Sequence, residues 1–364
     1  MLTDSNNFPT FRGTGVGAQL LGVGTAHPER YYRQEELLDA FEMSDRKIRS
    51  IFLNGGIGGR YLELDSSHVG KDSVPENQKN LLDKHKTTGL RIGRDAIDKC
   101  LDSVGRSRDE IEFLCCVTST GILIPGFSAL LITEMGLKAS CQRLDVVGMG
   151  CNAGLNGLAA VASWSNSNPG SMAILVCIEV CSAMYIYDEQ IGNAVVNSLF
   201  GDGAAACAVE NTAEREHNNP NIVKFSSHII TDELYAMRSE WDSDHGKFRF
   251  CLDPAIPYVI GANANVAIDR LLAKEDISVN DIDHWVVHSG GRKVIDGVRM
   301  NLGLSKHDLR HTISVLHDFG NLSSSSFMFS YQRLLNESKA KPSDIGMMMT
   351  MGPGSTIELA LLRW

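Results

Sequence analysis

Apolar and polar residues follow one another along the chain in blocks whose lengths suit strands and helices in turn. Two nearly continuous apolar runs, EIEFLCCVTST from Glu110 and SMAILVCIEV from Ser171, predict strands that are buried on both faces. Between them, FSALLITEMGL has a helix-like composition and reaches Gly136, a residue type common at helix C-termini. Because strand-like and helix-like segments alternate, the pattern predicts an α/β fold.

The apolar pattern also repeats within the chain. The stretches DEIEFLCCVTS and NDIDHWVVHS each contain an acidic–Ile–acidic triplet that leads into an apolar strand. Ile111 of the first stretch precedes Cys151 by 40 residues, and Ile282 of the second precedes Asn321 by 39. At both endpoints a glycine stands directly before the polar residue, and small residues follow as in the first turn of a helix.

A third match lies further along each copy. FGDGAAACAVE and MGPGSTIELAL both make a Gly-x-Gly turn into a strand-like run. Three matches in the same order predict that one βα unit has been duplicated. We therefore expect two related halves, residues 1–215 and 216–364, the first carrying Cys151 and the second carrying His288 and Asn321.

Cys151 stands in DVVGMGCNAGLNGLA, where a strand-like run turns sharply into a helix-like run. If the equivalent helix starts face each other, Cys151 and Asn321 meet in one cavity and His288 joins them from the end of a strand. Free N–H groups at a helix start, the helix dipole and a nearby imidazole all favour thiolate over thiol. The sequence therefore predicts a Cys-His-Asn set in which Cys151 is the most reactive of the nine cysteines.

Each of these residues also has a structural interpretation. Most cysteines are small core residues, and a single histidine is more often a hydrogen-bonded structural group. Asn321 after a glycine is compatible with a turn or a helix cap.

Composition and charge narrow the classes of function. Of the 364 residues 43% are hydrophobic, which is enough for a large core. The formal net charge of −10 argues against broad nucleic-acid binding, although a small polyanionic ligand needs only a few local cations. We find no apolar run near the roughly 20 residues of a membrane span, so no membrane association is expected.

Cysteine usage points to a reducing compartment. The nine cysteines are odd in number and irregularly spaced, as is typical of reduced thiols. The sequence contains no C-x-x-C pair, so a zinc site is not expected. The N-terminal MLTDSNNFPTFRG has neither a basic leader nor an apolar core segment. We therefore expect a cytoplasmic protein.

The motifs GMGCNAG, VVHSGGRKVID, DFGNLSSSSF and MGPGSTIE together resemble the thiolase-fold condensing enzymes, specifically the type III polyketide synthases. The resemblance covers about residues 22–364. KIRSIFLN, LLDKHK, CCVTSTG, VVNSLFGDG and DHWVVHSGG are further similar to a bacterial branch of this family that makes 3,5-dihydroxyphenylacetyl-CoA for antibiotic biosynthesis. The plant chalcone synthases share the Cys-His-Asn set but not these stretches.

The resemblance implies a five-layered αβαβα fold of two similar halves, and a homodimer. It also implies an acyltransferase that condenses four malonyl-CoA units with loss of carbon dioxide and water, assisted by pathway helper enzymes. Cys151 would carry the growing chain, and His288 and Asn321 would stabilise charge on the thioester oxygen. CoA thioesters are the substrates, and no metal or redox cofactor is implied.

The resemblance assigns further residues around this site. Phe200, in LFGDG, matches the family's gate between the CoA tunnel and the cavity, and Phe248 is a second candidate gate. Both would otherwise be ordinary core aromatics. In TGILIPGFS, Ile124 and Pro125 match a loop that reaches across the dimer interface and whose X-Pro bond is cis; otherwise this is a surface turn with a trans proline.

The phosphates of CoA need cations. Lys47 matches a phosphate-binding position of the family, with Arg46 and Arg49 in the same helical turn; two other basic positions of the plant enzymes are Ser50 and Asn54 here. A solvated helix face is the alternative. The candidates for additional contacts are the two basic residues after the Gly-Gly pair, Arg292 and Lys293.

Three other functions stay open on the sequence. The chain could be a ketoacyl synthase III that makes one condensation with an acyl carrier protein. It could be a type III synthase with another starter or ring closure. A non-catalytic dimerisation scaffold is a third alternative, but scaffolding puts no demand on an intact Cys-His-Asn set.

Overall fold

The computed structural model describes residues 17–65, 67, 69, 76–188, 190–212 and 219–364. The N-terminal stretch MLTDSNNFPTFRG, in which no leader is predicted, lies outside the described residues. The predicted boundary between residues 215 and 216 lies outside them too. No helix in the described ranges combines the length and the apolar content that a membrane span requires.

Nine strands form one mixed sheet in two parts. The first part, in spatial order, consists of β1 (Ala18–Ala26), β7 (Gly203–Asn211), β6 (Met172–Glu179), β4 (Ile111–Thr118) and β5 (Gln142–Val147). The second consists of β8 (Asn221–Ile229), β13 (Thr356–Arg363), β12 (Ile345–Gly352) and β11 (His284–Val287). The two parts join where Gln19 of β1 pairs with Asn221 of β8.

The two parts repeat one arrangement of strand directions. In the first part β1 is antiparallel to β7, β7 is antiparallel to β6, and β6 is parallel to β4. In the second part β8 is antiparallel to β13, β13 is antiparallel to β12, and β12 is parallel to β11. The order and the directions agree with the duplication that the sequence predicts.

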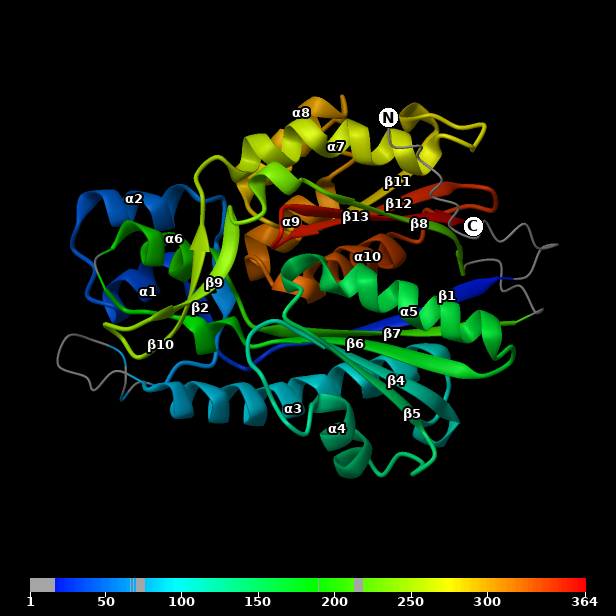
Figure 1. The fold of residues 1–364 in the computed structure, drawn as a ribbon, viewed down its shortest axis with the longest axis horizontal. Helices are drawn as coiled ribbons and strands as arrows, with labels where there is room; N and C mark the ends of the chain where they lie inside the picture. Colours follow the sequence, from blue (N-terminus) through cyan, green and yellow to red (C-terminus); the bar gives the residue numbers. More distant parts are fainter. Residues whose placement is uncertain (1–16, 66, 68, 70–75, 189, 213–218) are drawn as a thin grey trace.

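Helices cover these strands in layers (Figure 1). The long α3 (Gln78–Val104) and α4 (Phe127–Met135) cover the outer face of the first part. The central layer contains α5 (Ala153–Ser167) and α10 (Ser326–Glu337), and α7 (Ile256–Leu272) and α8 (Arg292–Asn301) cover the far face of the second part. The protein therefore has the predicted thiolase-like αβαβα fold.

The sequence explains several of these elements directly. The helix α4 ends before Gly136, whose φ of 66° is the left-handed C-cap that the glycine predicts. Every residue of β6 is buried, as the continuous apolar run requires. At Gly24 a Cβ atom would lie 2.2 Å from the backbone nitrogen of Cys100, so only glycine lets β1 pack this closely on α3.

The acidic–Ile–acidic triplets mark equivalent turns before β4 and β11. Ser107 and Glu110 cap each other in the 3₁₀ turn Arg108–Glu110, which leads into β4. Ser278 and Asp281 do the same in the turn Val279–Asp281, which precedes β11. Glu110 and Asp281, the first acidic residues of the two triplets, thus act as local caps.

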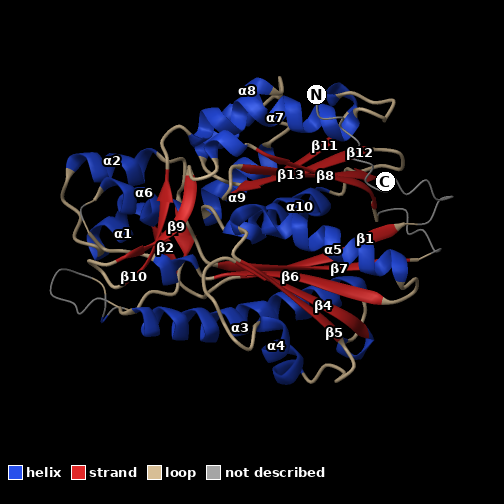
Figure 2. Ribbon diagram, viewed as in Figure 1, coloured by secondary structure: helices blue, strands red, loops and turns tan. Residues whose placement is uncertain are grey.

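The remaining elements gather at one end of the layers (Figure 2). The helices are α1 (Gln34–Ala40), α2 (Arg46–Asn54), α6 (Ile191–Leu199) and α9 (Arg310–Phe319). The strands form two small pairs, β2 (Tyr31–Arg33) with β3 (Gly59–Tyr61) and β9 (Met237–Asp242) with β10 (Lys247–Leu252). The β10 strand packs on α6, close to where Cys151 emerges from the central layer.

Candidate active site

Cys151 lies at the turn that connects the edge strand β5 to the central helix α5. The turn contains Gly148 and Gly150, with φ of 80° and 79°, and passes through the 3₁₀ turn Gly150–Asn152. A Cβ atom on Gly150 would lie 2.2 Å from Cδ of Pro353, so both the backbone angle and the space require glycine. The glycines flanking Cys151 therefore place its buried thiol at a helix start, as predicted.

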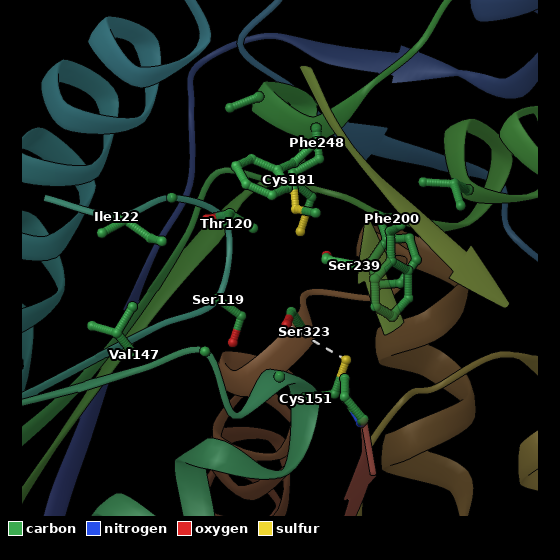
Figure 3. Close-up of a pocket in the computed structure, with 18 of the residues that line it drawn as sticks. Ser119, Thr120, Ile122, Val147, Cys151, Cys181, Phe200, Ser239, Phe248 and Ser323 are labelled. Atoms are coloured by element: carbon green, nitrogen blue, oxygen red, sulfur yellow. Dashed lines mark hydrogen bonds between the residues drawn. The ribbon is translucent and has the colours of Figure 1, made fainter. Parts of the chain in front are cut away.

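Asn321 occupies the equivalent place in the second half of the chain. It precedes the 3₁₀ turn Ser323–Ser325, which continues directly into α10. The Ser323 hydroxyl donates a hydrogen bond to Cys151 Sγ at 3.5 Å, and the Ser323 backbone N–H donates to Asn321 Oδ1 at 2.8 Å. Ser323 thus connects the two predicted residues, and Figure 3 shows its contact with Cys151.

His288 joins this arrangement through Ser326. The single hydroxyl hydrogen of Ser326 is donated to the Ser323 carbonyl at 3.0 Å, so Ser326 Oγ accepts a hydrogen bond from His288 Nδ1. This assigns the Nδ1–H tautomer to His288 and leaves Nε2 with a free lone pair. The serines of DFGNLSSSSF therefore link the predicted catalytic residues, a role that the sequence reasoning missed.

A cavity of about 310 Å³ opens beside Cys151. Cys151, Ser323 and Phe200 line it, whereas His288 and Asn321 are buried and are not among its lining residues. Within the described part of the chain, no hydrogen bond connects Cys151 to His288. The structure therefore brings the predicted set together through Ser323 and Ser326, without direct contact between thiol and imidazole.

Burial dominates the charge state of both groups. It raises the pKa of the Cys151 thiol to about 12, and the nearby Glu179 acts in the same direction, against the hydrogen bond from Ser323. Burial also lowers the pKa of His288 to about 3. Burial therefore opposes the predicted thiolate, against the helix start and the imidazole that favour it.

Both predicted gate residues line the cavity. Phe200 directly follows α6, and Phe248 lies on β10 with 47% of its surface exposed. Phe250, which the sequence reasoning missed, also lines the cavity and packs its ring edge-to-face against Phe200 at 5.6 Å. Phe248 and Phe250 are two residues apart on one strand, so the period-two pattern of β10 could have identified them as a pair.

The backbone of Phe200 is held by a buried cation. Arg60 is fully buried, and its guanidinium donates to the carbonyls of Phe200 at 2.7 Å and Asn197 at 2.6 Å. The same group donates to the side chains of Tyr185 and Gln34. Burial lowers the pKa of Arg60. GGRYLEL carries no pattern that signals this role.

The five cations predicted to bind CoA lie outside the cavity lining. Arg46 and Lys47 are exposed at the start of α2, whereas Arg49 is half-buried and lies 4.0 Å from an Asp39 carboxylate oxygen. Arg292 and Lys293 begin α8. A Cβ atom on Gly56, just after α2, would lie 3.3 Å from Cδ of Arg292, so Arg292 adjoins the end of that helix.

The loop before α4 has the predicted backbone. The Ile124–Pro125 peptide bond is cis, as the sequence analysis predicts. Ile122 lines the cavity, whereas the side chain of Ile124 is 95% exposed. Beside this loop, the edge strand β5 exposes Leu144 and Val147. Apolar side chains thus gather where the sheet ends.

Comparison with known proteins gives consistent matches. Residues 9–212 match the family described as "Chalcone and stilbene synthases, N-terminal domain", and residues 243–364 match its C-terminal domain. A 3,5-dihydroxyphenylacetyl-CoA synthase of Amycolatopsis orientalis is 53% identical over 94% of this chain and 92% of that protein. Its counterpart in Amycolatopsis balhimycina is 54% identical over the same shares.

A solved structure has the same fold. PKS-I from the brown alga Ectocarpus siliculosus superposes with a TM-score of 0.88 and 26% identity, covering 97% of this chain and 99% of that one.

Proposed function

The chain belongs to the family of chalcone and stilbene synthases, the type III polyketide synthases, and from that premise we propose that it makes 3,5-dihydroxyphenylacetyl-CoA from four molecules of malonyl-CoA. The observation that carries the proposal is the identity of 53–54%, over 94% of the chain, with synthases of that name. The buried thiol that lines the cavity, and the imidazole and amide linked to it through Ser323 and Ser326, support it, because decarboxylative condensation needs a nucleophile and hydrogen-bond donors.

Loading begins with a proton transfer. Nδ1 of His288 donates to Ser326, so Nε2 carries the free lone pair. Nε2 takes the thiol proton as Sγ attacks the thioester carbonyl of malonyl-CoA, so each new charge stabilises the other. The bond between the carbonyl carbon and the CoA sulfur breaks, CoA leaves as a thiolate that takes a proton from water, and the thiol proton stays on Nε2 of His288. The product is an acyl thioester on Cys151.

Extension needs a carbanion, which a second malonyl-CoA supplies. Its bond to the carboxylate breaks, carbon dioxide leaves, and the electron pair becomes an enolate whose charge lies on the thioester oxygen. The Asn321 amide is oriented for this role, because Oδ1 accepts from Ser323 N–H and Nδ2 is bound only weakly, to the Gly290 carbonyl at 3.4 Å. The amide and a protonated His288 are the two donors to the developing charge.

The enolate carbon attacks the acyl carbon on Cys151, a carbon–carbon bond forms, and the bond to Sγ breaks. The lengthened chain, now a CoA thioester, is transferred back to Cys151 before each further round. Three such extensions give an eight-carbon tetraketide.

Each malonyl unit keeps two carbons, so four units contribute eight. They release four molecules of carbon dioxide, three from the extender units and one from the starter unit, which loses its own carboxylate. Ring closure joins the terminal carbon to the third carbon from the thioester, and loss of one water yields the dihydroxyphenyl ring. The thioester carbonyl takes no part in the ring, so the product leaves as a CoA thioester.

The proposal extends to the setting of the reaction. Two copies pair through the edge strand β5 and the loop at Ile124, whose exposed apolar side chains are suited to burial in a homodimer. Lys47 and the neighbouring cations receive the CoA phosphates. Helper enzymes complete the aromatisation, and the reaction takes place in the cytoplasm, which is consistent with nine free cysteines.

The deciding experiment is product analysis. Purified protein is incubated with malonyl-CoA alone and with malonyl-CoA plus acetyl-CoA, with the Cys151→Ala variant as a control. Mass spectrometry should detect a dihydroxyphenylacetyl thioester, or its acid, from malonyl-CoA alone. The proposal fails if products form only with a separate acyl-CoA starter, or if only pyrones appear even with helper enzymes present.

A further inference from the structure

The helix α6 ends directly before the gate residue Phe200. The last carbonyl groups of a helix find no partner within it, so they need donors from elsewhere in the fold. Two carbonyls at this helix end, those of Asn197 and Phe200, accept hydrogen bonds from Arg60 at 2.6 and 2.7 Å. A guanidinium is suited to this place, because the carbonyl end of a helix carries partial negative charge. Arg60 thus caps the helix that leads to the gate.

Gln34 shares the capping of α6 with Arg60. Its Nε2 donates to the Ser198 carbonyl at 2.9 Å and to the Phe52 carbonyl at 3.2 Å, and its Oε1 accepts from Arg60 at 2.8 Å. Phe52 lies in α2, the helix that also carries Lys47, and α2 packs beside α6 (Figure 1). The side chains of Gln34 and Arg60, both buried, therefore form one polar unit that connects the two helices.

The stem of Arg60 contacts the turn that presents Asn321. Gly320 directly precedes Asn321, and a Cβ atom on this glycine would lie 2.7 Å from Cδ of Arg60. The Asn321 N–H donates to the Leu199 carbonyl at 2.8 Å, which is a further carbonyl of the same helix end. One side chain therefore touches both the segment that carries the gate and the segment that carries the amide.

The charge of Arg60 is balanced inside the protein. Burial lowers the pKa of the guanidinium, whereas the Tyr185 hydroxyl and the Asp202 carboxylate act in the opposite direction. Asp202 is held by Ser182, whose backbone N–H and hydroxyl both donate to it, at 2.7 and 2.6 Å. Within the described residues Nε of Arg60 has no hydrogen-bond partner, so the cap depends on the two terminal nitrogens. Lysine lacks this forked end.

We propose that Arg60, together with Gln34, is a positioning residue for decarboxylation and chain extension, and that it fixes the Asn321 amide and the Phe200 ring relative to each other. The inference rests on the proposed roles of Asn321 as a donor to the enolate and of Phe200 as a gate. Among the described residues that line the cavity, neither Arg60 nor Gln34 occurs, so both act through the backbone. A shift at the end of α6 moves the ring, and the bridge between Phe200 and Asn321 passes the shift to the amide.

A purely structural role of Arg60 predicts a different result. A buried cation that only stabilised the fold would change the amount of folded enzyme, and every activity would fall by the same factor. A positioning role lowers the rate at each folded active site and changes the proportion of products. The measurements are therefore normalised to the fraction of protein that loads an acyl group on Cys151, which intact-protein mass spectrometry provides.

The first measurement is the release of labelled carbon dioxide from malonyl-CoA. Arg60→Met removes the donors but keeps a long stem, and it should lower kcat about 10- to 100-fold with little change in KM, because a small displacement of a positioned group costs that much. Arg60→Lys keeps the charge and can still donate to the carbonyls, so its kcat should lie between the two. Leu101→Ala is the control, since it weakens the core beside α3, and it should keep the wild-type kcat for each active site.

A double-mutant cycle with Asn321→Leu shows whether Arg60 acts through the amide. Arg60→Met should slow decarboxylation in the wild type but not further in Asn321→Leu, from which the amide is already missing. Effects that multiply would overturn the inference, as would a wild-type kcat in Arg60→Met. If Arg60→Met does not fold, Gln34→Met removes the other half of the cap and enters the same cycle, with the same two contrary outcomes.

The length of the released products reports on the gate. A displaced Phe200 ring lets short chains leave, so Arg60→Met should raise the share of short lactones several-fold, whereas Leu101→Ala should keep the wild-type share. An unchanged share in Arg60→Met would contradict its role at the gate. Decarboxylation precedes ring closure and can be measured whichever product forms. A wild-type protein that decarboxylates malonyl-CoA but makes another product would therefore refute the proposed function and leave this test intact.

Discussion

Asn321 pairs with Phe200 in an isolated parallel bridge between the two halves of the chain. The Asn321 N–H donates to the Leu199 carbonyl at 2.8 Å, and its own carbonyl accepts from Gly201 N–H at 2.9 Å. The amide proposed to stabilise the enolate and the ring proposed to gate the cavity are therefore held by one backbone unit. A shift of the gate and a shift of the amide are coupled.

We predict that the two catalytic functions separate by substitution. Cys151→Ala should abolish acyl loading and chain extension but retain slow decarboxylation of malonyl-CoA, because His288 and Asn321 remain. Asn321→Leu removes a donor to the enolate and should lower decarboxylation about 10²–10³-fold. Intact-protein mass spectrometry reports loading, and release of labelled carbon dioxide reports decarboxylation.

Cys181→Ala is the matched control, because Cys181 lines the same cavity. It should still be loaded. Loading that persists in Cys151→Ala and disappears in Cys181→Ala would show that the nucleophile is Cys181 and not Cys151.

A second prediction reverses the order of thiol reactivity expected from the sequence. Cys251 is the only one of the nine cysteines that is not buried, and the pKa of Cys151 is raised to about 12. At pH 7 iodoacetamide should therefore modify Cys251 before Cys151 in the free protein. Peptide mapping over a time course gives the order. Faster labelling of Cys151 would show that the imidazole does form an ion pair with the thiol before substrate binds.

These two thiols show that the position of a cysteine can be predicted from sequence, whereas its burial cannot. The place of Cys151 at a helix start could be predicted, because glycines, apolar runs and an internal repeat are local patterns. The pKa of the Cys151 thiol could not be predicted from sequence, because desolvation depends on which segments of the folded chain bury the thiol. Ser323 and Pro353, far away in the sequence, supply part of that cover.

The same distinction holds for the residues that sequence reasoning missed. Arg60 and Glu179 are charged residues in ordinary contexts, and only the folded chain shows that both are fully buried. Arg60 is held by carbonyl groups from a distant turn, and Glu179 by backbone groups of two loops. Such partners leave no periodic signal. Phe250 is different, since its period-two relation to Phe248 was visible.

A third prediction concerns acid stability. Burial lowers the pKa of His85 to about 4 and of His288 to about 3, from 6.5 in the unfolded chain. Below pH 6.5 these histidines are protonated in the unfolded state but not in the folded state. Each histidine therefore lowers the free energy of unfolding by about 1.4 kcal/mol for each unit by which the pH falls. Glu179, with a pKa raised to about 7, acts oppositely between pH 7 and 4.5.

For these three groups, two losses and one gain leave a net loss of about 1.4 kcal/mol per unit between pH 6.5 and 4.5. Urea unfolding at four pH values in this range measures it. Glu179→Gln removes the opposing gain, so its loss should be about twice as steep. A free energy of unfolding that stays level or rises on acidification would contradict the assigned burial of these imidazoles.

A fourth prediction concerns the phosphates of CoA. Lys47 is exposed at the start of α2, where its charge is available to a polyanion. Lys47→Glu should raise the KM for malonyl-CoA several-fold with little change in kcat, and the difference should shrink at high salt. Lys274→Glu makes the same charge change at an exposed site after α7 and should leave KM unchanged. Equal effects of the two variants would indicate general electrostatics instead of a phosphate site.

The last prediction concerns assembly. Ile124 is 95% exposed beside the cis peptide bond, and Ile122, Leu144 and Val147 are exposed close to it at the edge of the sheet. Exposed apolar side chains of this kind favour an interaction surface, and a strand edge offers unpaired backbone groups to a second copy. Ile124→Glu places a charge in the centre of that surface, where burial without a partner is costly. Sedimentation velocity should therefore show a dimer for the wild type and an increased share of monomer for the variant, with unchanged circular dichroism.

Met300→Glu alters a similarly exposed apolar residue on α8, which covers the opposite side of the layers, and should remain dimeric. A monomeric wild type, or an Ile124→Glu variant that dimerises as tightly as Met300→Glu, would place the interface elsewhere.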